Sequence, residues 1–538
     1  MMALARRDSR PVLTWRAAAT AALTVATLAF AQASAQPSQV RGSRYIATTD
    51  WMNDAVARLR SRGYLAALNP ITQPWTRDAV ARALAKIPAA SLDTMPRHVS
   101  QWIRLLRSDL GPEFLRLEGR DSLALGFVAW GSAVAATSPR VDPYFPIRKG
   151  TAPINGKGRN PGSVWPSHGA GGWAERGPFA MELRVGWDLA LRRADPDGVF
   201  PQRSFDVLPD NEVTYVSART ANAAFVVGRL RRNWAPVGTK GLMLSDAAIG
   251  IPQLGYEVGG RNLILRGFVG ELDTLKGRER YVAAHRLEYV RDNFAVSIGE
   301  SKVYGSSGGP RIVNLNPLEI FFITGDKLGG EQPTSTSLDG QFWLRRGRVT
   351  MSGETFVDDI WVVGHAPLRA ALSTSALYMG PAPWLDLGID YRVVLSFTYW
   401  TPKFANSDQM SYHGRGLGDN ASDYDRVTLH ANIYPGIAGL RLTPTLALQR
   451  KGEWDFRRDT IPDQVWRQKS QFLQGIAERT TRLALAGRYQ PNRRVFAEWD
   501  AGANLVRNAD HVAGLDRTEF SAMLHVGAMW SSPSRQAP

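Results

Sequence analysis

The stretch from Trp384 to Trp400 reads WLDLGIDYRVVLSFTYW, and it decides the fold class. Every odd-numbered position from Leu385 to Tyr399 is apolar, whereas the even-numbered positions are mostly polar or charged, as at Asp386 and Arg392. Side chains of a β-strand alternate between its two faces, so a period of two predicts a strand with one apolar and one polar face. We therefore expect a strand over 385–399.

The same alternation recurs along most of the chain. Sixteen further segments show it, and with 385–399 they make seventeen expected strands. The other expected strands are 121–130, 181–191, 211–217, 223–230, 251–258, 262–270, 281–290, 294–301, 340–346, 348–357, 369–379, 426–433, 438–449, 480–489, 494–506 and 518–530. So many two-faced strands in one chain predict a large barrel.

The spacing of these strands indicates the kind of barrel. Long connections alternate with short ones: 358–368, 400–425, 450–479 and 507–517 are long, whereas 380–383, 434–437 and 490–493 are short. Outer-membrane barrels combine longer outer loops with short periplasmic turns and have an even number of strands. We therefore expect one more strand in the Gly/Pro-rich stretch 131–178, near Val164 to Trp173, which gives about eighteen antiparallel strands.

The first 35 residues predict export. Four arginines precede an apolar run over 17–30, and Ala33-Ser34-Ala35 matches a cleavage site, so we expect residues 1–35 to be a signal peptide. No later segment approaches the roughly 20 consecutive apolar residues of a spanning helix. Strands of a closed barrel are then the expected way across a membrane. The sequence predicts a bacterial outer-membrane protein with a periplasmic amino-terminal region and extracellular loops.

Residues 36–118 differ from the rest in periodicity. Thr49 or Asp50 can cap a first helix, Thr76 a second, and Pro96 can open a third. Such short helices bury little on their own, so we expect them to dock, either as a periplasmic plug of the barrel or as a small independent domain. We assign 36–118 to this helical plug region, 119–531 to the barrel and 532–538 to a carboxy-terminal tail.

Composition favours anionic partners. The chain has no cysteine and a formal net charge of +16, of which the expected signal contributes four arginines and Asp8, so about +13 remains after its removal. This excess suits phosphorylated outer-membrane lipids including lipopolysaccharide, or an acidic polysaccharide. The alternative is that the basic residues only lie against lipopolysaccharide. Nothing in the sequence indicates nucleic-acid binding, a cofactor or a metal ion, and the eight histidines show no ligand spacing.

Loop 231–250 carries the candidate binding residues. The strand count places it on the outer side, and it joins Arg229, Arg231, Arg232, Asn233 and Trp234. Guanidinium groups offer paired donors to a carboxylate, and an indole offers an apolar face to a sugar ring. We expect a polysaccharide-binding site there; the alternative is that the arginines pair with luminal acids and the tryptophan packs within the loop.

Three motifs carry a resemblance. The segment 231–238 reads R-x-x-W-x-P-x-G and is followed by Leu242-Met243-Leu244-Ser245; with 155–165 and 354–359 it resembles the capsule assembly Wzi family of outer-membrane proteins. The resemblance covers nearly the whole chain after the signal. It implies an eighteen-stranded barrel plugged by a helical bundle, which anchors capsular polysaccharide as a lectin. The polysaccharide export machinery is a further candidate partner.

Two acidic groups stand near expected loops. Glu354, Asp358 and Asp359 form a rim acidic cluster, which could pair with arginines, bind a cation or act on a glycan. A second group comprises Asp419, Asn420, Asp423 and Asp425, in an order unlike an EF-hand. We expect no catalytic residue among them.

The expected function is therefore a non-catalytic surface lectin for capsular or other acidic exopolysaccharide. An outer-membrane porin or solute channel gated by the helical region is the main alternative. A barrel hydrolase using loop histidines is a third, although the sequence has no Gly-x-Ser-x-Gly elbow.

Overall fold

The computed structural model describes residues 42–119, 123–137, 143–145, 163–188, 213–275, 277–306, 309–316, 318–321, 334–358, 368–400, 409–456, 472–532 and 535–536. The expected signal peptide 1–35 lies outside these residues. No described helix is long and apolar enough to span a membrane.

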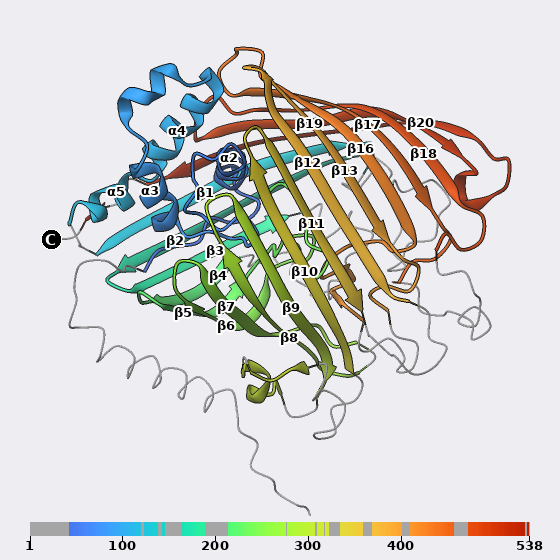
Figure 1. The fold of residues 1–538 in the computed structure, drawn as a ribbon, viewed down its shortest axis with the longest axis horizontal. Helices are drawn as coiled ribbons and strands as arrows, with labels where there is room; N and C mark the ends of the chain where they lie inside the picture. Colours follow the sequence, from blue (N-terminus) through green and yellow to red (C-terminus); the bar gives the residue numbers. More distant parts are fainter. Residues whose placement is uncertain are drawn as a thin grey trace, which may run out of the picture.

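Eighteen antiparallel strands form one closed barrel, as the sequence predicted (Figure 1). Each strand pairs with its neighbours in the chain, and β1 pairs with β20 to close the ring. The strands are β1 Ala124–Ala136, β2 Ser163–Arg176, β3 Phe179–Asp188, β4 Val213–Arg219, β5 Ala223–Leu230, β6 Ile251–Gly259, β7 Leu263–Glu271, β8 Arg280–Val290, β9 Phe294–Gly305, β10 Thr334–Arg346, β11 Val349–Asp358, β12 Ala370–Ala382, β13 Leu385–Val394, β16 Tyr424–Ile433, β17 Leu440–Lys451, β18 Glu478–Tyr489, β19 Val495–Arg507 and β20 Arg517–Ser531.

The described residues also contain three two-residue strands outside this count. β21 (Arg535–Gln536) pairs with the beginning of β1. β14 (Ser411–Tyr412) and β15 (Arg415–Gly416) form a separate hairpin within the connection from β13 to β16.

The strand expected near Val164 to Trp173 is β2, and the parity argument is confirmed. It pairs with β1 on one side and β3 on the other. Val164 is 66% exposed whereas Trp165 is 8% exposed, which is the alternation of a barrel wall. Glycines on its inner face, such as Gly169, hid the pattern from a hydropathy reading.

The outer face of the barrel is apolar and exposed, whereas charged side chains are buried inside it. On β20 the outward residues include Phe520, which is 67% exposed, and Trp530. On β8 the inward residues Arg286 and Glu288 are fully buried. Outward apolar and inward polar faces are the pattern of a barrel surrounded by lipid.

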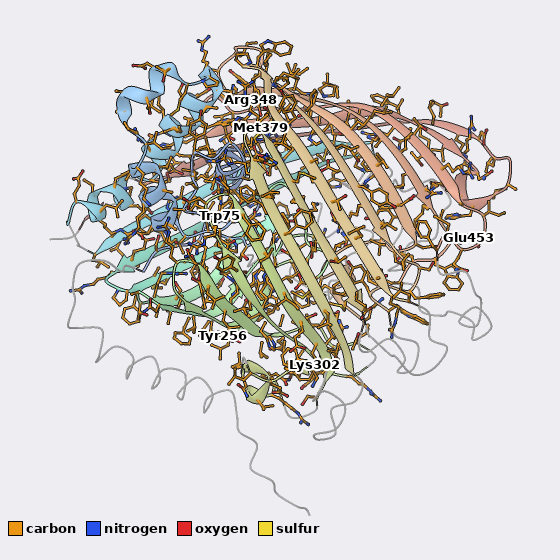
Figure 2. All side chains as sticks on the ribbon, viewed as in Figure 1. Trp75, Tyr256, Lys302, Arg348, Met379 and Glu453 are labelled. Atoms are coloured by element: carbon orange, nitrogen blue, oxygen red, sulfur yellow. The ribbon has the colours of Figure 1, made fainter. Side chains whose placement is uncertain are left out.

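Connection length alternates around the barrel. At one end of the barrel, which we call the short-turn end, consecutive strands are joined by short turns. These turns are 177–178, 220–222, 260–262, 291–293, 347–348, 383–384, 434–439 and 490–494. The intervening connections leave from the opposite, long-loop end: 137–162, 189–212, 231–250, 272–279, 306–333, 359–369, 395–423, 452–477 and 508–516. Figure 2 labels Arg348 near the short-turn end and Lys302 near the long-loop end.

In the described part of the chain before the barrel, residues 42–119, there are four α-helices: α2 Trp51–Ser61, α3 Arg77–Ala85, α4 Arg97–Asp109 and α5 Gly111–Leu117, with a 3-10 turn, η1 Ala89–Thr94. The caps are those expected, because the Asp50 carboxylate accepts from Met52 N at 3.0 Å and the Thr76 hydroxyl from Ala79 N at 3.3 Å. The fourth helix, α5, was not predicted. It begins at a Gly-Pro pair, and proline is compatible with a first helical turn.

These helices lie at the short-turn end, with α2 inside the barrel (Figure 1). They pack around a shared apolar core that includes Val56 and Leu84. The described helical region, 42–119, is also tied to the wall by polar contacts: Arg62 forms an ion pair with Asp386 of β13, and Asn69 Nδ2 donates to Glu288 Oε2 of β8 at 2.6 Å. It therefore docks inside the barrel rather than standing apart from it.

The opening stretch 384–400 forms a shorter strand than its periodicity predicts. β13 ends at Val394, and the chain then turns into the lumen, with Tyr399 at φ 70°. Phe397 and Tyr399 are fully buried there. The prediction of a strand to 399 was wrong because alternating apolar residues look the same whether they face lipid or an internal apolar cluster.

Candidate functional site

Segment 231–250 folds into the lumen, not outward as expected. Its backbone pairs with the helical region, since Gln73 N donates to Asn233 O at 2.9 Å and Asn233 N donates to Gln73 O at 3.1 Å. Further along, Val237 N donates to Pro70 O at 2.7 Å. The expected position of this loop at an outer rim is therefore wrong; it forms an inner layer of the barrel.

Trp234 lies at the centre of this layer and is 0% exposed. Its ring meets Phe268 edge-on at a centroid distance of 5.4 Å, and the Arg286 guanidinium lies 5.3 Å from its centroid. Its carbonyl accepts from Gln341 Nε2 at 2.6 Å. The indole therefore has no free face for a sugar in this conformation, and the expected stacking platform is not present.

Asn233 shapes the same turn. Its Nδ2 donates to Thr239 O and its Oδ1 accepts from Gly241 N, both at 2.9 Å. These two bonds close the loop on itself, so the side chain is engaged within the protein. Arg231, two residues earlier, is half-buried.

The flanking arginines also hold the segment. Arg229 Nη1 donates to Gly250 O at 3.1 Å, and Arg232 Nε donates to Gln253 Oε1 at 2.6 Å. Burial lowers the pKa of Arg232 to about 10. The structure thus brings the five predicted residues together, and Arg229, Arg232, Asn233 and Trp234 support the segment internally. Contact of the five residues with a glycan stays a prediction.

The rim acids are buried on β11. Glu354 Oε1 accepts hydrogen bonds from the backbone N–H of Leu242 at 2.7 Å and of the next residue at 3.2 Å. Asp358 Oδ2 accepts from Tyr399 N at 2.7 Å. Each of these two carboxylates secures an inward-folded segment, and their role as a rim acidic cluster stays a prediction. Asp359 lies outside the described residues.

The second acidic group is likewise divided among separate partners. Asp419 Oδ2 accepts from Arg392 Nε at 2.6 Å; burial would raise the pKa of Asp419, but this guanidinium keeps it below its usual range. Asp423 Oδ1 accepts from Leu473 N at 2.6 Å. Among the described residues no group of three or more His, Cys, Asp or Glu side chains is placed to hold a metal ion.

An apolar cluster joins the inward-folded segments across the lumen. Its members come from 231–250, from the described residues of 395–421, from the wall strands β6–β9, β11–β13 and β16, and from Leu272 and Phe456. They include Trp234, Leu242, Leu244, Phe268, Phe356, Phe397, Tyr399, Leu417 and Tyr424. Toward the long-loop end, the described lumen is therefore crossed by packed side chains.

Buried ion pairs join members of the helical region to one another and to the short-turn end of β2. Glu175 of β2 pairs with Arg44 at 3.2 Å and with Arg116 at 2.6 Å, and Glu113 of α5 pairs with Arg77 at 2.6 Å. Burial would raise the pKa of Glu113, but Arg77 and Arg44 outweigh it and lower that pKa. The charges of this buried cluster pair with one another, so removing either partner of a pair would leave an uncompensated buried charge.

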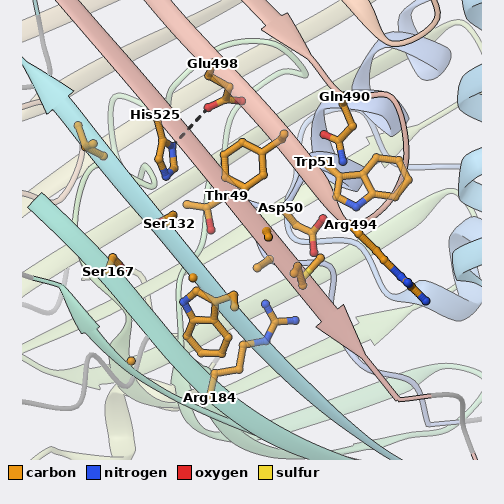
Figure 3. A pocket seen from close by; sticks show the side chains of 18 of the residues that line it. Thr49, Asp50, Trp51, Ser132, Ser167, Arg184, Gln490, Arg494, Glu498 and His525 are labelled. Carbon is orange, nitrogen blue, oxygen red and sulfur yellow. Dashed lines mark ion pairs between the residues drawn. The ribbon is translucent and has the colours of Figure 1, made fainter. Parts of the chain in front are cut away.

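A cavity of about 360 Å³ remains between the start of α2 and the wall formed by β18–β20 and β1–β3 (Figure 3). Trp130, Trp165 and Arg184 line it, and Glu498 and His525 face it from β19 and β20. The His525 Nδ1 lies 3.8 Å from a Glu498 oxygen. The sequence reasoning missed this cavity, although the strand parity of Trp130 and Trp165 assigns both side chains to the lumen.

A second, smaller cavity has a volume of about 240 Å³. It is bounded by 238–240 and by Arg392 and Arg426 from β13 and β16. Arg426 is covered by Tyr144, whose ring centroid lies 4.2 Å from the guanidinium carbon.

Solved structures place this fold among outer-membrane barrels. One similar structure is Wzi of Escherichia coli, an outer-membrane protein involved in group 1 capsule assembly and described as a carbohydrate-binding β-barrel. The two structures superimpose with a TM-score of 0.58 at 11% sequence identity, and the match covers 91% of this chain and 99% of that chain. Acinetobacter baumannii OccAB1 and Pseudomonas aeruginosa OccK3 (OpdO) have TM-scores of 0.45 and 0.42, each at 9% identity and covering 76% of this chain and 96% of that chain. The latter two similarities are too weak to support an inference about this chain.

No protein-family model matches the chain, and no curated protein matches it. The resemblance predicted from the three motifs is confirmed at the level of the fold: the chain is similar in fold to Wzi over nearly the whole length of both proteins.

Proposed function

We propose that this protein is a bacterial outer-membrane barrel that binds an exported acidic polysaccharide at the cell surface without transforming it. The observation that carries the proposal is a filled barrel. The lumen holds the docked helical region at one end and the inward layer around Trp234 at the other, and charged side chains on the inner wall, such as Arg286 and Glu288, are paired. A filled barrel suits a binding or anchoring role better than the passage of solutes.

The fold similarity supports the same reading. The similar structure, Wzi, is described as carbohydrate-binding and as involved in capsule assembly. In outer-membrane barrels the short turns face the periplasm, so the long-loop end and its connections would face the exterior. The net charge of +16 favours an anionic polymer, and a long polymer can engage many copies at once. Lipopolysaccharide and the export machinery remain proposed partners.

Binding of the purified, detergent-solubilised protein to polysaccharide from its own source tests the proposal. We expect saturable binding to the acidic polymer that weakens as salt rises, because charge-assisted contacts are screened. A neutral dextran of similar length is the control and should not bind. No binding to any surface polysaccharide fraction would overturn the proposal.

Two alternatives make different predictions in the same preparation. A solute channel gated by the helical region predicts steady ion conductance in a planar bilayer, whereas the filled barrel should be nearly silent. A hydrolase predicts release of reducing ends from the polymer and loss of that release after substitution of a loop histidine. We expect neither conductance nor turnover.

A further inference from the structure

The cavity beside α2 is a built feature of the wall. Small side chains line its inner surface on adjacent strands, and Ser132 of β1 and Ser167 of β2 are direct cross-strand partners there. Gly169, two residues further along β2, lets the Trp130 ring lie close against the wall, since a Cβ at this position would be 2.2 Å from that ring. The wall therefore leaves a cavity that can hold a ligand, and the Trp130 ring lies beside this cavity.

The helical region closes one side of this cavity without filling it. Its ion pairs reach β2 through Glu175, β13 through Asp386 and β17 through Arg441. Toward the cavity it presents the first residues of α2, with Asp50 and Trp51. A volume of about 360 Å³ is within the range of small-molecule sites.

The lining combines aromatic faces with fixed charges. Trp130 and Trp165 supply apolar ring surface, which suits the C–H face of a pyranose. Arg184 Nη2 is held at 2.8 Å by a Glu182 oxygen, and Arg488 is held by Glu498. Because these side chains are already positioned, a ligand does not have to order them on binding.

The cavity lining carries more positive than negative charge. Its basic side chains are Arg184, Arg488, Arg493 and Arg494, against the two acids Asp50 and Glu498. Among the ion pairs of the described residues, none involves Arg493 or Arg494. Arg494 is exposed and belongs to the turn 490–494, so one of the lining arginines is accessible at the short-turn end. A carboxylate can take paired hydrogen bonds from such a group.

We propose that this cavity is a luminal site for one acidic sugar residue, such as a hexuronate, with its ring against Trp130 and its carboxylate toward the arginines at the short-turn end. The choice of a sugar over another carboxylate rests on the proposed polysaccharide function. The site is separate from any contact that the long-loop end makes with a polymer.

Calorimetric titration of the full chain in detergent tests the proposal with three probes: D-glucuronate, D-glucose and acetate. We expect glucuronate to bind, with glucose and acetate each at least about tenfold weaker, because one lacks the charge and the other the ring. Absence of glucuronate binding would overturn the proposal. Equal binding of glucuronate and acetate would overturn the sugar site in favour of a general anion site.

Variants then locate the binding. Trp130→Ala removes the ring and Ser132→Phe fills the cavity without deleting a contact group; each should weaken glucuronate binding about tenfold or more. Trp384→Ala is the control, since Trp384 is 51% exposed in a short turn away from the lining, and it should bind as the parent does. Circular dichroism and heat-modifiable migration of each variant would verify that the barrel is intact.

The two proposals can fail separately. If the polysaccharide binds the parent but no variant changes glucuronate binding, the luminal site is wrong and the polysaccharide function stands. If glucuronate binds in a Trp130-dependent way but no polysaccharide binds, the luminal site stands and the surface-binding function is wrong.

Discussion

Replacing Glu354 with alanine should release the inward-folded loop around Leu242. The Glu354 carboxylate accepts two backbone N–H groups of that loop, at 2.7 and 3.2 Å, and all three residues are buried. Alanine leaves both donors without this acceptor in a site closed to solvent. Glutamine is the matched control, because its side-chain carbonyl can accept the same two bonds.

The size of the effect follows from those two donors. Each buried donor left unsatisfied costs about 1–3 kcal/mol, so the loop loses about 2–6 kcal/mol of its preference for the inward state. Since about 1.4 kcal/mol corresponds to a tenfold change in population, the open fraction should rise by between about 30-fold and about 10⁴-fold. The glutamine variant should remain close to the parent.

Site-specific labelling can measure this opening because the chain contains no cysteine. Ser245→Cys is a conservative reporter position, since Ser245 is 1% exposed and lies three residues after Leu242. Maleimide labelling of this single cysteine should be slow in the parent and in Glu354→Gln, and at least about 30-fold faster in Glu354→Ala. Equal labelling rates in the alanine and parent backgrounds would show that the carboxylate does not hold the loop.

Two further predictions concern the helical region. Asp386→Asn leaves the Arg62 guanidinium without its carboxylate and should weaken docking of the helical region by about 3–5 kcal/mol, measured as increased protease cleavage of that region. Asp93→Asn, which breaks an exposed ion pair, is the control and should change docking by less than about 1 kcal/mol. His98 stacks on Tyr434 with ring centroids 3.8 Å apart, and burial, with Arg62 nearby, lowers the pKa of His98 from 6.5 to about 3. Because the released region binds this proton more readily than the docked region, docking should weaken as pH falls from 6.5 toward 3. His98→Phe should remove that part of the pH dependence, and an unchanged acid profile in this variant would refute the prediction.

The barrel could be predicted from the sequence because lipid and lumen impose opposite demands on alternate side chains. Strands such as β19 and β20 show this directly, and the parity of strand number located β2 where hydropathy was uninformative. The strand prediction was wrong beyond Val394, since the apolar alternation continues to Tyr399 although the backbone has turned into the lumen. There the apolar side chains face an internal cluster instead of lipid.

The candidate site was predicted less well, because its contacts join distant parts of the chain. The sequence groups Asn233 and Trp234 with arginines, and the structure does bring these residues together. Their burial, however, depends on Gln73 and Gln341, which lie more than 100 residues away in sequence, one on each side. Local periodicity contains no information on such partners, so the inward direction of the loop could not be read from it.

The closing seam between β1 and β20 also sets an order of events in assembly. It pairs residues near the beginning of the barrel with residues near its end, as in Val128 with Ser531. The ring therefore stays open until the last strand has been delivered. The helical region precedes every strand, so it has to be enclosed as the sheet curls around it or enter later from the short-turn end. A chain shortened by one strand would leave two unpaired edges in the bilayer and an exposed polar interior.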